Sequence, residues 1–316
     1  MEYRYLFGPV PSRRFGRSLG IDLVTAKTCS FDCPFCEVGR TTLSTCERLE
    51  YVPVTDVVDE FNHWLENDGK ADVITLTGSG EPTLHSHFGD IIDAIKASCD
   101  ITVVLLTNST LLHLADVREA AAKADIVKCS LSAWDMESFR RINRPVKGLE
   151  LNQVVDGLRQ FRQEFSGKLW LEVFILKSVN DKPDDVAKIA ALAESIAPDV
   201  VQLNTVVRPP AESEAQPISQ DELRRLAPLF SPIAEIIAKF EADPTNENSS
   251  IVSSQHVQAM LMRRPCSAED ISGAFGIDAK TVAVLVEELL ASDSIQSIKR
   301  DDAVYYAPSI CRMKNA

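Results

Sequence analysis

Apolar runs alternate with amphipathic stretches from about residue 20 to residue 240. Between the apolar runs, helical periodicity predicts helices such as 55–66 and 219–240, and a Ser219–Glu222 capping box opens the second of these. The apolar runs are rich in β-branched residues and are apolar almost throughout, which is typical of parallel strands covered on both faces. They predict strands at 21–24, 72–77, 101–107, 125–131, 169–176 and 200–207. Six strand–helix units predict an α/β fold, either an open sheet or a partial barrel.

The pattern changes after residue 240. Residues 241–250 are polar, acidic and without periodicity, which predicts a linker. Beyond them we expect three helices, the last at 278–291, and then two strands in IQSIKRDDAVYYAP. Three helices and a hairpin predict a small winged-helix domain. The expected organisation is an N-terminal arm (1–20), a barrel (21–240), a linker (241–250) and a winged-helix-like domain (251–316).

Composition narrows the class of protein. The chain is 45% hydrophobic and 25% charged, as in ordinary globular proteins. It has no apolar run of about 18 residues, so we expect no membrane span, and its N-terminus lacks the apolar core of a secretory signal. We therefore expect a cytoplasmic protein with eight reduced cysteines. The net charge of −13 gives no support for a nucleic-acid partner.

Three of the cysteines crowd into TCSFDCPFC as Cys29, Cys33 and Cys36. A zinc site needs four ligands, and no second CxxC pair is present to complete one. A redox dithiol would leave Cys29 unexplained. The third reading is an iron–sulfur cluster held by three thiolates, whose fourth iron stays open to a small molecule.

A second motif follows the second predicted strand, in TLTGSGEPTL. Gly78 and Gly80 allow a ligand to approach the backbone closely, and Glu81 ends the loop at the carboxyl end of the strand. Taken alone, the pattern is equally compatible with an ordinary strand–helix turn.

Together these motifs resemble radical S-adenosylmethionine (SAM) enzymes. The resemblance rests on the CxxxCxxC spacing with Phe35 before the last cysteine, followed by GSGEP in the position of the family's GGE motif. It implies that Cys29, Cys33 and Cys36 hold a 4Fe-4S cluster, that SAM occupies the fourth iron, and that the GSGEP backbone receives the SAM amino group. It also implies a partial (βα)6 TIM-type barrel over about 20–240.

The chemistry implied by the resemblance is specific. One electron from a flavodoxin- or ferredoxin-type donor reduces the cluster, SAM is cleaved, and the resulting 5′-deoxyadenosyl radical abstracts hydrogen from a substrate. The protein itself supplies orientation, electrostatics and exclusion of water.

Polar residues near later strand ends are further candidates. In the family, such groups commonly meet the SAM ribose, carboxylate or adenine, which here implies Asn108, Ser130 and Asn204. The alternative for each is a hydrogen bond to loop backbone. Arg208 can bind a carboxylate or phosphate, or form an ion pair. A basic patch at Arg13, Arg14 and Arg17 around Phe15 can recognise an anionic substrate or cover the barrel as a structural arm.

Three longer segments resemble a narrower group, the radical SAM proteins similar to the wyosine-forming tRNA enzyme: YLFGPVPSRRFGRSLGIDLV, TCSFDCPFCEVGRTT and LNTVVRPPAE. That enzyme carries extra cysteines upstream for a second cluster, whereas no cysteine precedes Cys29 here. With the acidic charge, this favours a peptide, protein or small metabolite as substrate, with tRNA as runner-up.

The predicted winged helix leaves one alternative open. Its helix 278–291 carries one lysine and two glutamates, which disfavours DNA and favours a peptide or protein, such as a docked substrate, or self-association. The alternative function is a non-catalytic iron–sulfur sensor that acts through the winged helix.

Overall fold

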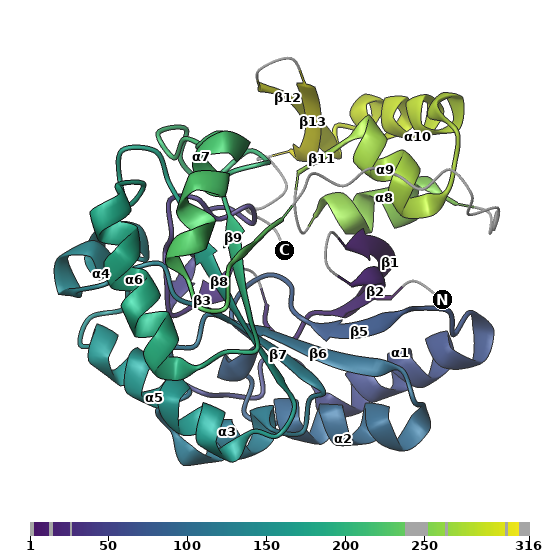
Figure 1. Ribbon diagram of the computed structural model, residues 1–316. Helices are drawn as coiled ribbons and strands as arrows, with labels where there is room; N and C mark the ends of the chain where they lie inside the picture. The colour runs from purple at the N-terminus through teal and green to yellow at the C-terminus, as the bar shows by residue number, and fades with distance from the viewer. Residues whose placement is uncertain are drawn as a thin grey trace.

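The larger part of the molecule is a curved sheet with helices on one side. The computed structural model describes residues 3–12, 15–25, 27–237, 252–262, 265–300 and 303–309. The predicted linker 241–250 and the arginines Arg13 and Arg14 lie outside the described residues. Figure 1 shows the sheet wrapped on its outer side by helices α1 to α6, with a smaller module above the N-terminal strands.

Eight strands form the sheet in the order β1-β2-β5-β6-β7-β8-β9-β10. All neighbours are parallel except β1 and β2, which form an antiparallel hairpin. The strands are β1 (Leu6–Ser12), β2 (Gly16–Ile21), β5 (Val73–Leu76), β6 (Thr102–Thr107), β7 (Ile126–Ser130), β8 (Lys168–Phe174), β9 (Val200–Asn204) and β10 (Glu235–Ile236). The six parallel strands from β2 to β9 form the partial barrel that was predicted.

The helices follow the strands along the chain and cover the outer face. They are α1 (Val54–Asn67), α2 (Phe88–Ser98), α3 (Ala115–Ala121), α4 (Met136–Ile142), α5 (Leu151–Glu164), α6 (Pro183–Ile196) and α7 (Gln220–Leu226). Helix α1 buries Val57, Phe61 and Trp64 against the sheet, as its periodicity predicts. Among the described residues, no helix is long and apolar enough to span a membrane.

The first parallel strand begins earlier than we expected. We predicted residues 21–24, whereas β2 ends at Ile21 and pairs with β5 over residues 18–21. A Cβ placed on Gly20 would lie 2.1 Å from the ring of Phe7 on β1, so this strand needs a glycine where β1 crosses it. Because β2 contains two glycines, it lacks the apolar run from which we predicted the other strands. Residues 6–21 are thus part of the sheet, although the division into domains stays a prediction.

The predicted helix 219–240 is wrong beyond its first two turns. The Ser219–Glu222 capping box is present and opens α7, but α7 ends at Leu226. Pro228 follows in a short 3-10 helix, η2 (Ala227–Leu229), because proline cannot donate to the helix ladder and its ring clashes with the preceding turn. The chain then forms β10, which pairs with β9.

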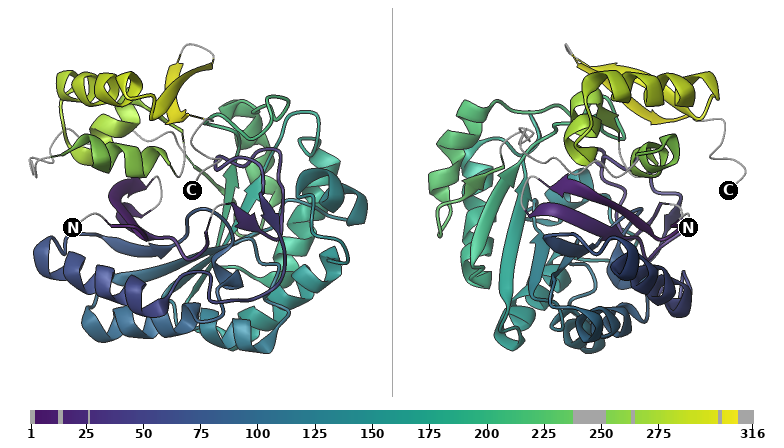
Figure 2. Two further views of the ribbon diagram at one scale, coloured as in Figure 1. Left: turned by 180° about the vertical axis from the view of Figure 1, so that it is seen from behind. Right: turned by 90° about the vertical axis from the view of Figure 1, so that its right-hand side faces the viewer.

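The C-terminal module contains three helices and a three-stranded antiparallel sheet. Its elements are α8 (Ser254–Leu261), β11 (Cys266–Ser267), α9 (Ala268–Phe275), α10 (Ala279–Ala291), β12 (Ile295–Arg300) and β13 (Ala303–Pro308). The three helices and the hairpin β12–β13 lie where the sequence predicted them, whereas β11 was not predicted. The assignment of the module as a winged helix stays a prediction. Val10 of β1 belongs to the module's apolar core, so the module packs on the N-terminal hairpin (Figure 2).

Candidate functional site

The three cysteines lie in one loop at the carboxyl end of β2. Cys29 ends β3 (Thr28–Cys29), which pairs in parallel with β4 (Leu43–Ser44), and Cys33 and Cys36 lie in the loop between the two strands. The Cys36 amide donates to the Cys33 carbonyl oxygen at 3.2 Å, which fixes the turn between them. All three side chains are partly buried.

Each cysteine sulfur has a nitrogen donor of its own. Lys27 Nζ lies 2.9 Å from Cys36 Sγ, and the Asn108 amide lies 3.5 Å from Cys29 Sγ. The Asn143 amide lies 3.7 Å from Cys33 Sγ. Hydrogen bonds of this kind stabilise sulfur in its thiolate form, which is the form that binds metal.

Burial opposes the deprotonation of two of these sulfurs, those of Cys29 and Cys33. Burial raises the pKa of Cys29 to about 12, with the nearby Glu81 carboxyl adding to the shift. Burial also raises the pKa of Cys33, and the neighbouring Cys36 and Cys29 raise it further. Bound iron would supply the positive charge that deprotonated sulfurs need.

Among the described residues, no group of three His, Cys, Asp or Glu side chains is arranged to hold a single metal ion. In an iron–sulfur cluster each cysteine binds a different iron, so three cysteine sulfurs need not converge on one point.

The GSGEP loop packs directly against the cysteine loop. A Cβ on Gly80 would lie 1.7 Å from the Thr28 carbonyl oxygen, and one on Gly78, where φ is +132°, would lie 2.3 Å from Asp22 Cγ. The Ser79 amide and hydroxyl both donate to the Asp22 carboxylate, at 3.0 and 2.5 Å. Both glycines are therefore needed for this close approach.

Glu81 holds this end of the sheet together. One carboxylate oxygen accepts from the Thr83 amide and from the Thr83 and Thr107 hydroxyls, and the other accepts from the Asn108 amide at 2.7 Å. Glu81 is 2% exposed, and burial raises the pKa of its carboxyl despite these donors. It thereby positions Asn108, whose side chain also donates to Ser30 Oγ at 2.9 Å.

Some of the predicted site residues lie around Cys29, and others lie at the ends of β7 and β9. Asn108, Gly80 and Glu81 surround Cys29. Ser130 is half-buried at the end of β7, and Asn204 is 5% exposed at the end of β9, where it donates to Glu172 at 3.1 Å. Their contacts with SAM stay predictions.

Phe35 is stacked on Phe174 at the end of β8. The ring centroids are 4.2 Å apart and the planes are inclined by 15°. This stack ties the residue before Cys36 to the inner side of the sheet, the side without helices. The aromatic residue of the motif thus connects the cysteine loop to the barrel.

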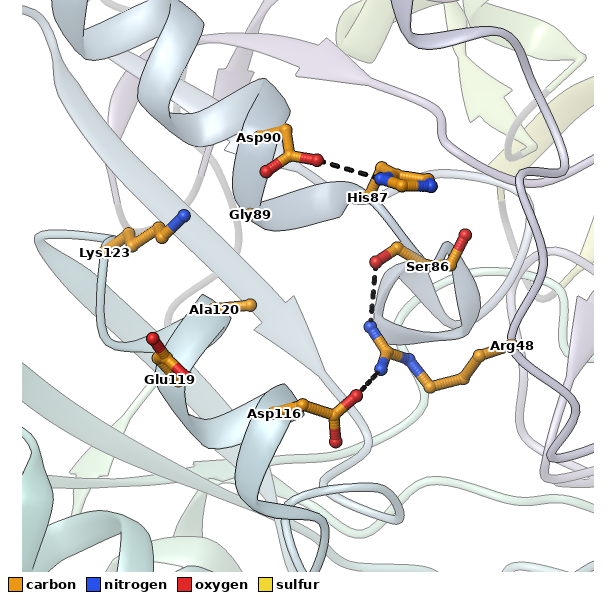
Figure 3. A pocket seen from close by; sticks show the side chains of 9 residues that line it. All are labelled: Arg48, Ser86, His87, Gly89, Asp90, Asp116, Glu119, Ala120 and Lys123. Carbon is orange, nitrogen blue, oxygen red and sulfur yellow. Dashed lines mark hydrogen bonds and ion pairs between the residues drawn. The ribbon is translucent and has the colours of Figure 1, made fainter.

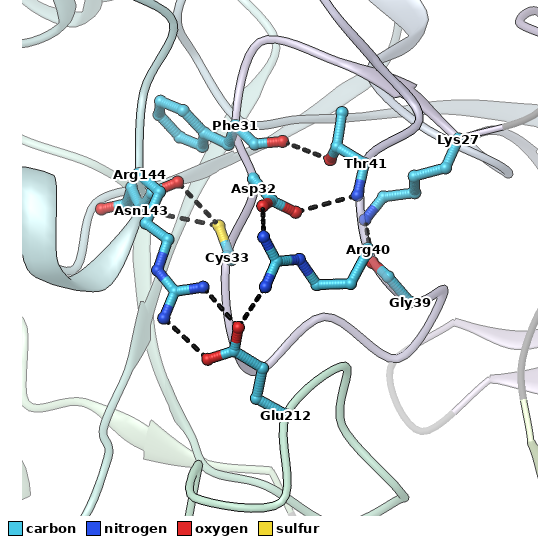
Figure 4. Close-up of polar contacts among 10 residues, drawn as sticks. All are labelled: Lys27, Phe31, Asp32, Cys33, Gly39, Arg40, Thr41, Asn143, Arg144 and Glu212. Atoms are coloured by element: carbon cyan, nitrogen blue, oxygen red, sulfur yellow. Dashed lines mark hydrogen bonds and ion pairs between the residues drawn. The ribbon is translucent and has the colours of Figure 1, made fainter.

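The sequence did not reveal the ion pairs that brace the cysteine loop. Arg144 donates to both carboxylate oxygens of Glu212, at 2.6 and 2.7 Å, and Arg40 joins Glu212 to Asp32 (Figure 4). The segments involved are far apart in the chain, so only their fold reveals the pairing. Lys27 was also missed, although a lysine two residues before Cys29 was a signal that the sequence contained.

Arg208 forms a buried ion pair rather than the surface pair weighed in the sequence. It is 5% exposed and lies 3.3 Å from Glu37, next to Cys36, and 3.2 Å from Asp270 on α9. Burial lowers the pKa of Arg208, but the two carboxylates outweigh it, so the net pKa is raised. Arg208 therefore joins the cysteine loop to the C-terminal module.

A polar hollow on the outside of the barrel is separate from these residues. It lies between α2 and α3 and is lined by Arg48, His87, Asp116 and Lys123, among others (Figure 3). The Arg48 guanidinium donates there to the carbonyl oxygens of Thr83 and Ser86 and to the Asp116 carboxylate. The hollow contains none of the predicted site residues.

Comparisons with known proteins agree with this geometry. The profile of the radical SAM superfamily matches residues 23–192. The UPF0026 protein MJ1312 of Methanocaldococcus jannaschii is 35% identical over 245 residues, covering 75% of this chain and 76% of that protein. A Brachyspira hyodysenteriae protein named GTPase Obg is 32% identical over 312 residues, covering 98% of this chain and 46% of that protein. Because the chain spans less than half of that protein, the name transfers no activity.

A solved structure supports the fold. The structure of TYW1 with a lysine–pyruvate adduct bound is similar with a TM-score of 0.54 and 18% identity, over 72% of this chain and 76% of TYW1. At this identity the likeness shows the architecture alone. Together with the superfamily match and the cysteine geometry, it confirms the partial barrel. The chain belongs to the radical SAM superfamily, whose enzymes use a 4Fe-4S cluster and S-adenosylmethionine and generally need a reductant such as flavodoxin or ferredoxin.

Proposed function

We propose that this radical SAM enzyme holds its cluster on Cys29, Cys33 and Cys36 and abstracts hydrogen from a peptide, protein or small-metabolite substrate. When bound, the cluster and SAM supply the 5′-deoxyadenosyl radical. The observation that carries the proposal is the set of three sulfurs, each with its own nitrogen donor, packed against the GSGEP loop. tRNA as substrate is the runner-up, since the net charge of −13 does not favour it.

The chain's own residues have distinct tasks in this proposal. Gly78 and Gly80 let the GSGEP backbone pack closely against the cysteine loop. There the GSGEP backbone is to receive the methionyl amino group. Glu81 orients the Asn108 amide and so the side chain that meets Cys29. Phe35, stacked on Phe174, covers the loop from the barrel side and limits water there.

The test is anaerobic cleavage of SAM. The cluster is reconstituted, reduced with dithionite and mixed with SAM, and 5′-deoxyadenosine is measured by mass spectrometry. We expect product from the natural chain and none from Cys33→Ala. Cys99→Ala is the matched control, because Cys99 caps the end of α2 and donates or accepts nothing at the cysteine loop.

Two results would contradict the proposal. One is a cluster that forms on the natural chain without binding or cleaving SAM, which would favour an iron–sulfur sensor. The other is unchanged cluster content and product in Cys33→Ala, which would place the cluster elsewhere.

A further inference from the structure

The inner face of β7, β8 and β9 is unusually polar. Residues alternate along these strands, and the helix-facing set, including Val127, Leu171 and Leu203, is fully buried hydrocarbon. The other set faces the inside of the barrel. It includes Lys128 and Ser130 on β7, Trp170 and Glu172 on β8, and Gln202 and Asn204 on β9, together with the apolar Ile126, Phe174 and Val200. Strand register places Ser130, Glu172 and Gln202 side by side.

A buried ion pair lies at the centre of this face. Lys128 Nζ is 2.7 Å from one carboxylate oxygen of Glu172, and the Asn204 amide donates to the other oxygen at 3.1 Å. The side chains of Lys128 and Glu172 are 6% and 15% exposed. Burying such a pair costs about as much as it returns, and hydrocarbon of similar volume is often as stable or more stable. Stability alone therefore does not explain why these charges are here.

Two neighbouring polar atoms point to a missing ligand. The side-chain oxygen of Gln202 and the indole nitrogen of Trp170 are buried and have no hydrogen-bond partner among the described residues. Gln202 is 4% exposed and is the register neighbour of Glu172. Buried polar groups are almost always paired, so an acceptor and a donor left over on one face require an explanation. A ligand that both donates and accepts would satisfy them.

The Lys128–Glu172 pair lies close enough to the cysteine loop for a substrate bound there to be within reach of the proposed cluster. Phe174, two residues beyond Glu172 on the same face, is stacked on Phe35 next to Cys36. Two strand residues span roughly 7 Å, so the ion pair lies one step below the cysteine loop. At the other end, Phe15 from the β1–β2 turn is stacked on Trp170 at 4.9 Å and closes the face from below.

Charge selects the class of ligand. Lys128 and Glu172 present one charge of each sign to the inside of the barrel. A zwitterion matches both charges, because its carboxylate can contact Lys128 and the Trp170 N–H while its ammonium contacts Glu172 and the Gln202 oxygen. We propose that Lys128, Glu172, Gln202 and Trp170 bind the zwitterionic head of a free amino acid as the substrate of this enzyme. This inference rests on the proposed function and narrows its substrate to a small metabolite.

The first test is binding to the reconstituted protein. The common amino acids are screened in pools by thermal shift, and any that bind are measured by calorimetry against matched analogues. For alanine the analogues are propionate, ethylamine and pyruvate. Propionate lacks the ammonium and ethylamine lacks the carboxylate. Pyruvate keeps the carboxylate and has a ketone in place of the amine. We expect at least one amino acid to bind and each analogue to bind about tenfold more weakly or worse.

A paired variant separates binding from folding. Lys128→Met with Glu172→Leu replaces the ion pair by hydrocarbon and removes the acceptor of the Asn204 amide, so we expect a folded protein with at most a small loss of stability and a loss of amino acid binding of about a hundredfold. Lys123→Met with Asp93→Leu removes a more exposed pair, 2.5 Å apart, on the outside of the barrel and should leave binding unchanged. Glu172→Gln alone should make the amino acid and its deaminated analogue bind alike.

Several outcomes would overturn the inference. They are the absence of binding by any amino acid, equal binding of pyruvate or propionate by the natural protein, and binding retained by the Lys128→Met, Glu172→Leu variant. The same natural preparation is assayed for 5′-deoxyadenosine. If that product forms while no amino acid binds, the site is wrong and the proposed function stands.

Discussion

The two faces of β7, β8 and β9 carry different side chains, apolar ones on the outer face and mainly polar ones on the inner face. On the outer face Val127, Leu171 and Leu203 are 0% exposed and pack against the helices. On the inner face Lys128 and Glu172 form an ion pair, with 6% and 15% of their side chains exposed. Burial of hydrocarbon stabilises a fold, whereas a buried ion pair contributes little. We infer that the outer face carries stability and the inner face carries function.

The largest effect should come from the outer face. Leu171→Ala removes a fully buried side chain from the middle of β8 and leaves a cavity, so we expect a loss of about 2–5 kcal/mol in the free energy of unfolding. Urea unfolding followed by circular dichroism measures it. The Lys128→Met, Glu172→Leu variant serves as the control from the inner face and should lose less. A greater loss from the inner pair than from Leu171→Ala would reverse the comparison.

Arg208 follows β9 and provides a second buried charge for comparison, at the edge of the inner face next to the C-terminal module. Arg208→Met removes the buried guanidinium that pairs with Glu37 and Asp270. Because both carboxylates are partly exposed and can be hydrated, we expect a loss of about 2–3 kcal/mol, near the lower end for a broken buried pair. The measurement is again urea unfolding, with Arg208→Lys as the charge-preserving control. A loss below about 0.5 kcal/mol would mean that the two carboxylates need no partner.

Lys27 sharpens the comparison, because it is a second buried lysine with a different partner. Its side chain donates to Cys36 Sγ at 2.9 Å and to the Gly39 carbonyl oxygen at 2.6 Å. Burial lowers the pKa of Lys27, but the Cys36 sulfur raises it and the net pKa is raised. A positive charge at a ligand sulfur favours the reduced cluster, so Lys27→Met should lower the reduction potential.

The size of this change follows from the hydrogen bond. A difference of about 1.4 kcal/mol between the two oxidation states corresponds to about 59 mV for one electron, and we expect a shift of that order. A redox titration followed by electron paramagnetic resonance measures it, and Lys27→Arg should restore most of the potential. An unchanged potential in Lys27→Met at full cluster content would limit Lys27 to holding the loop.

The sequence predicted the elements better than the contacts. Apolar periodicity located β5 to β9 and helix α1, because burial on the helix side leaves a regular pattern. It misplaced β2, where Gly20 faces the ring of Phe7 on a neighbouring strand, and it extended α7 through Pro228. The proline was a local signal that we underweighted, whereas the Phe7 contact depends on the tertiary fold.

The same limit applies to the site. Cys29, Cys33 and Cys36 could be predicted because the motif is local. The network of Arg40, Arg144 and Glu212 could not, because Glu212 lies 68 residues from Arg144 and 172 from Arg40 in the chain. Lys128 was visible as a charge inside an apolar strand, but its partner Glu172 lies on the next strand and only register connects them.

The ion pairs of Glu212 with Arg40 and Arg144 are more exposed than the Lys128–Glu172 pair on the inner face. Hydrogen bonds from Arg144 lower the pKa of its carboxyl, and the charges of Arg144 and Arg40 add to this. A carboxyl whose pKa is lower in the folded state stabilises the protein above its unfolded pKa, and this contribution is lost as pH falls through the folded pKa. Glu212→Gln should therefore cost stability at pH 7 and nothing in acid below that folded pKa.

The expected cost at pH 7 is small, because Arg40 and Arg144 are 56% and 37% exposed and water screens the pair. We expect about 0.5–1 kcal/mol, decreasing with added salt. Urea unfolding of both proteins across the acid range measures the difference, and Asp221→Asn, which breaks an exposed pair with Arg224 on α7, is the matched control. A cost that persists unchanged in acid would show that Glu212 acts by packing. A cost as large as that of Arg208→Met would mean that exposure does not distinguish the ion pairs of this molecule.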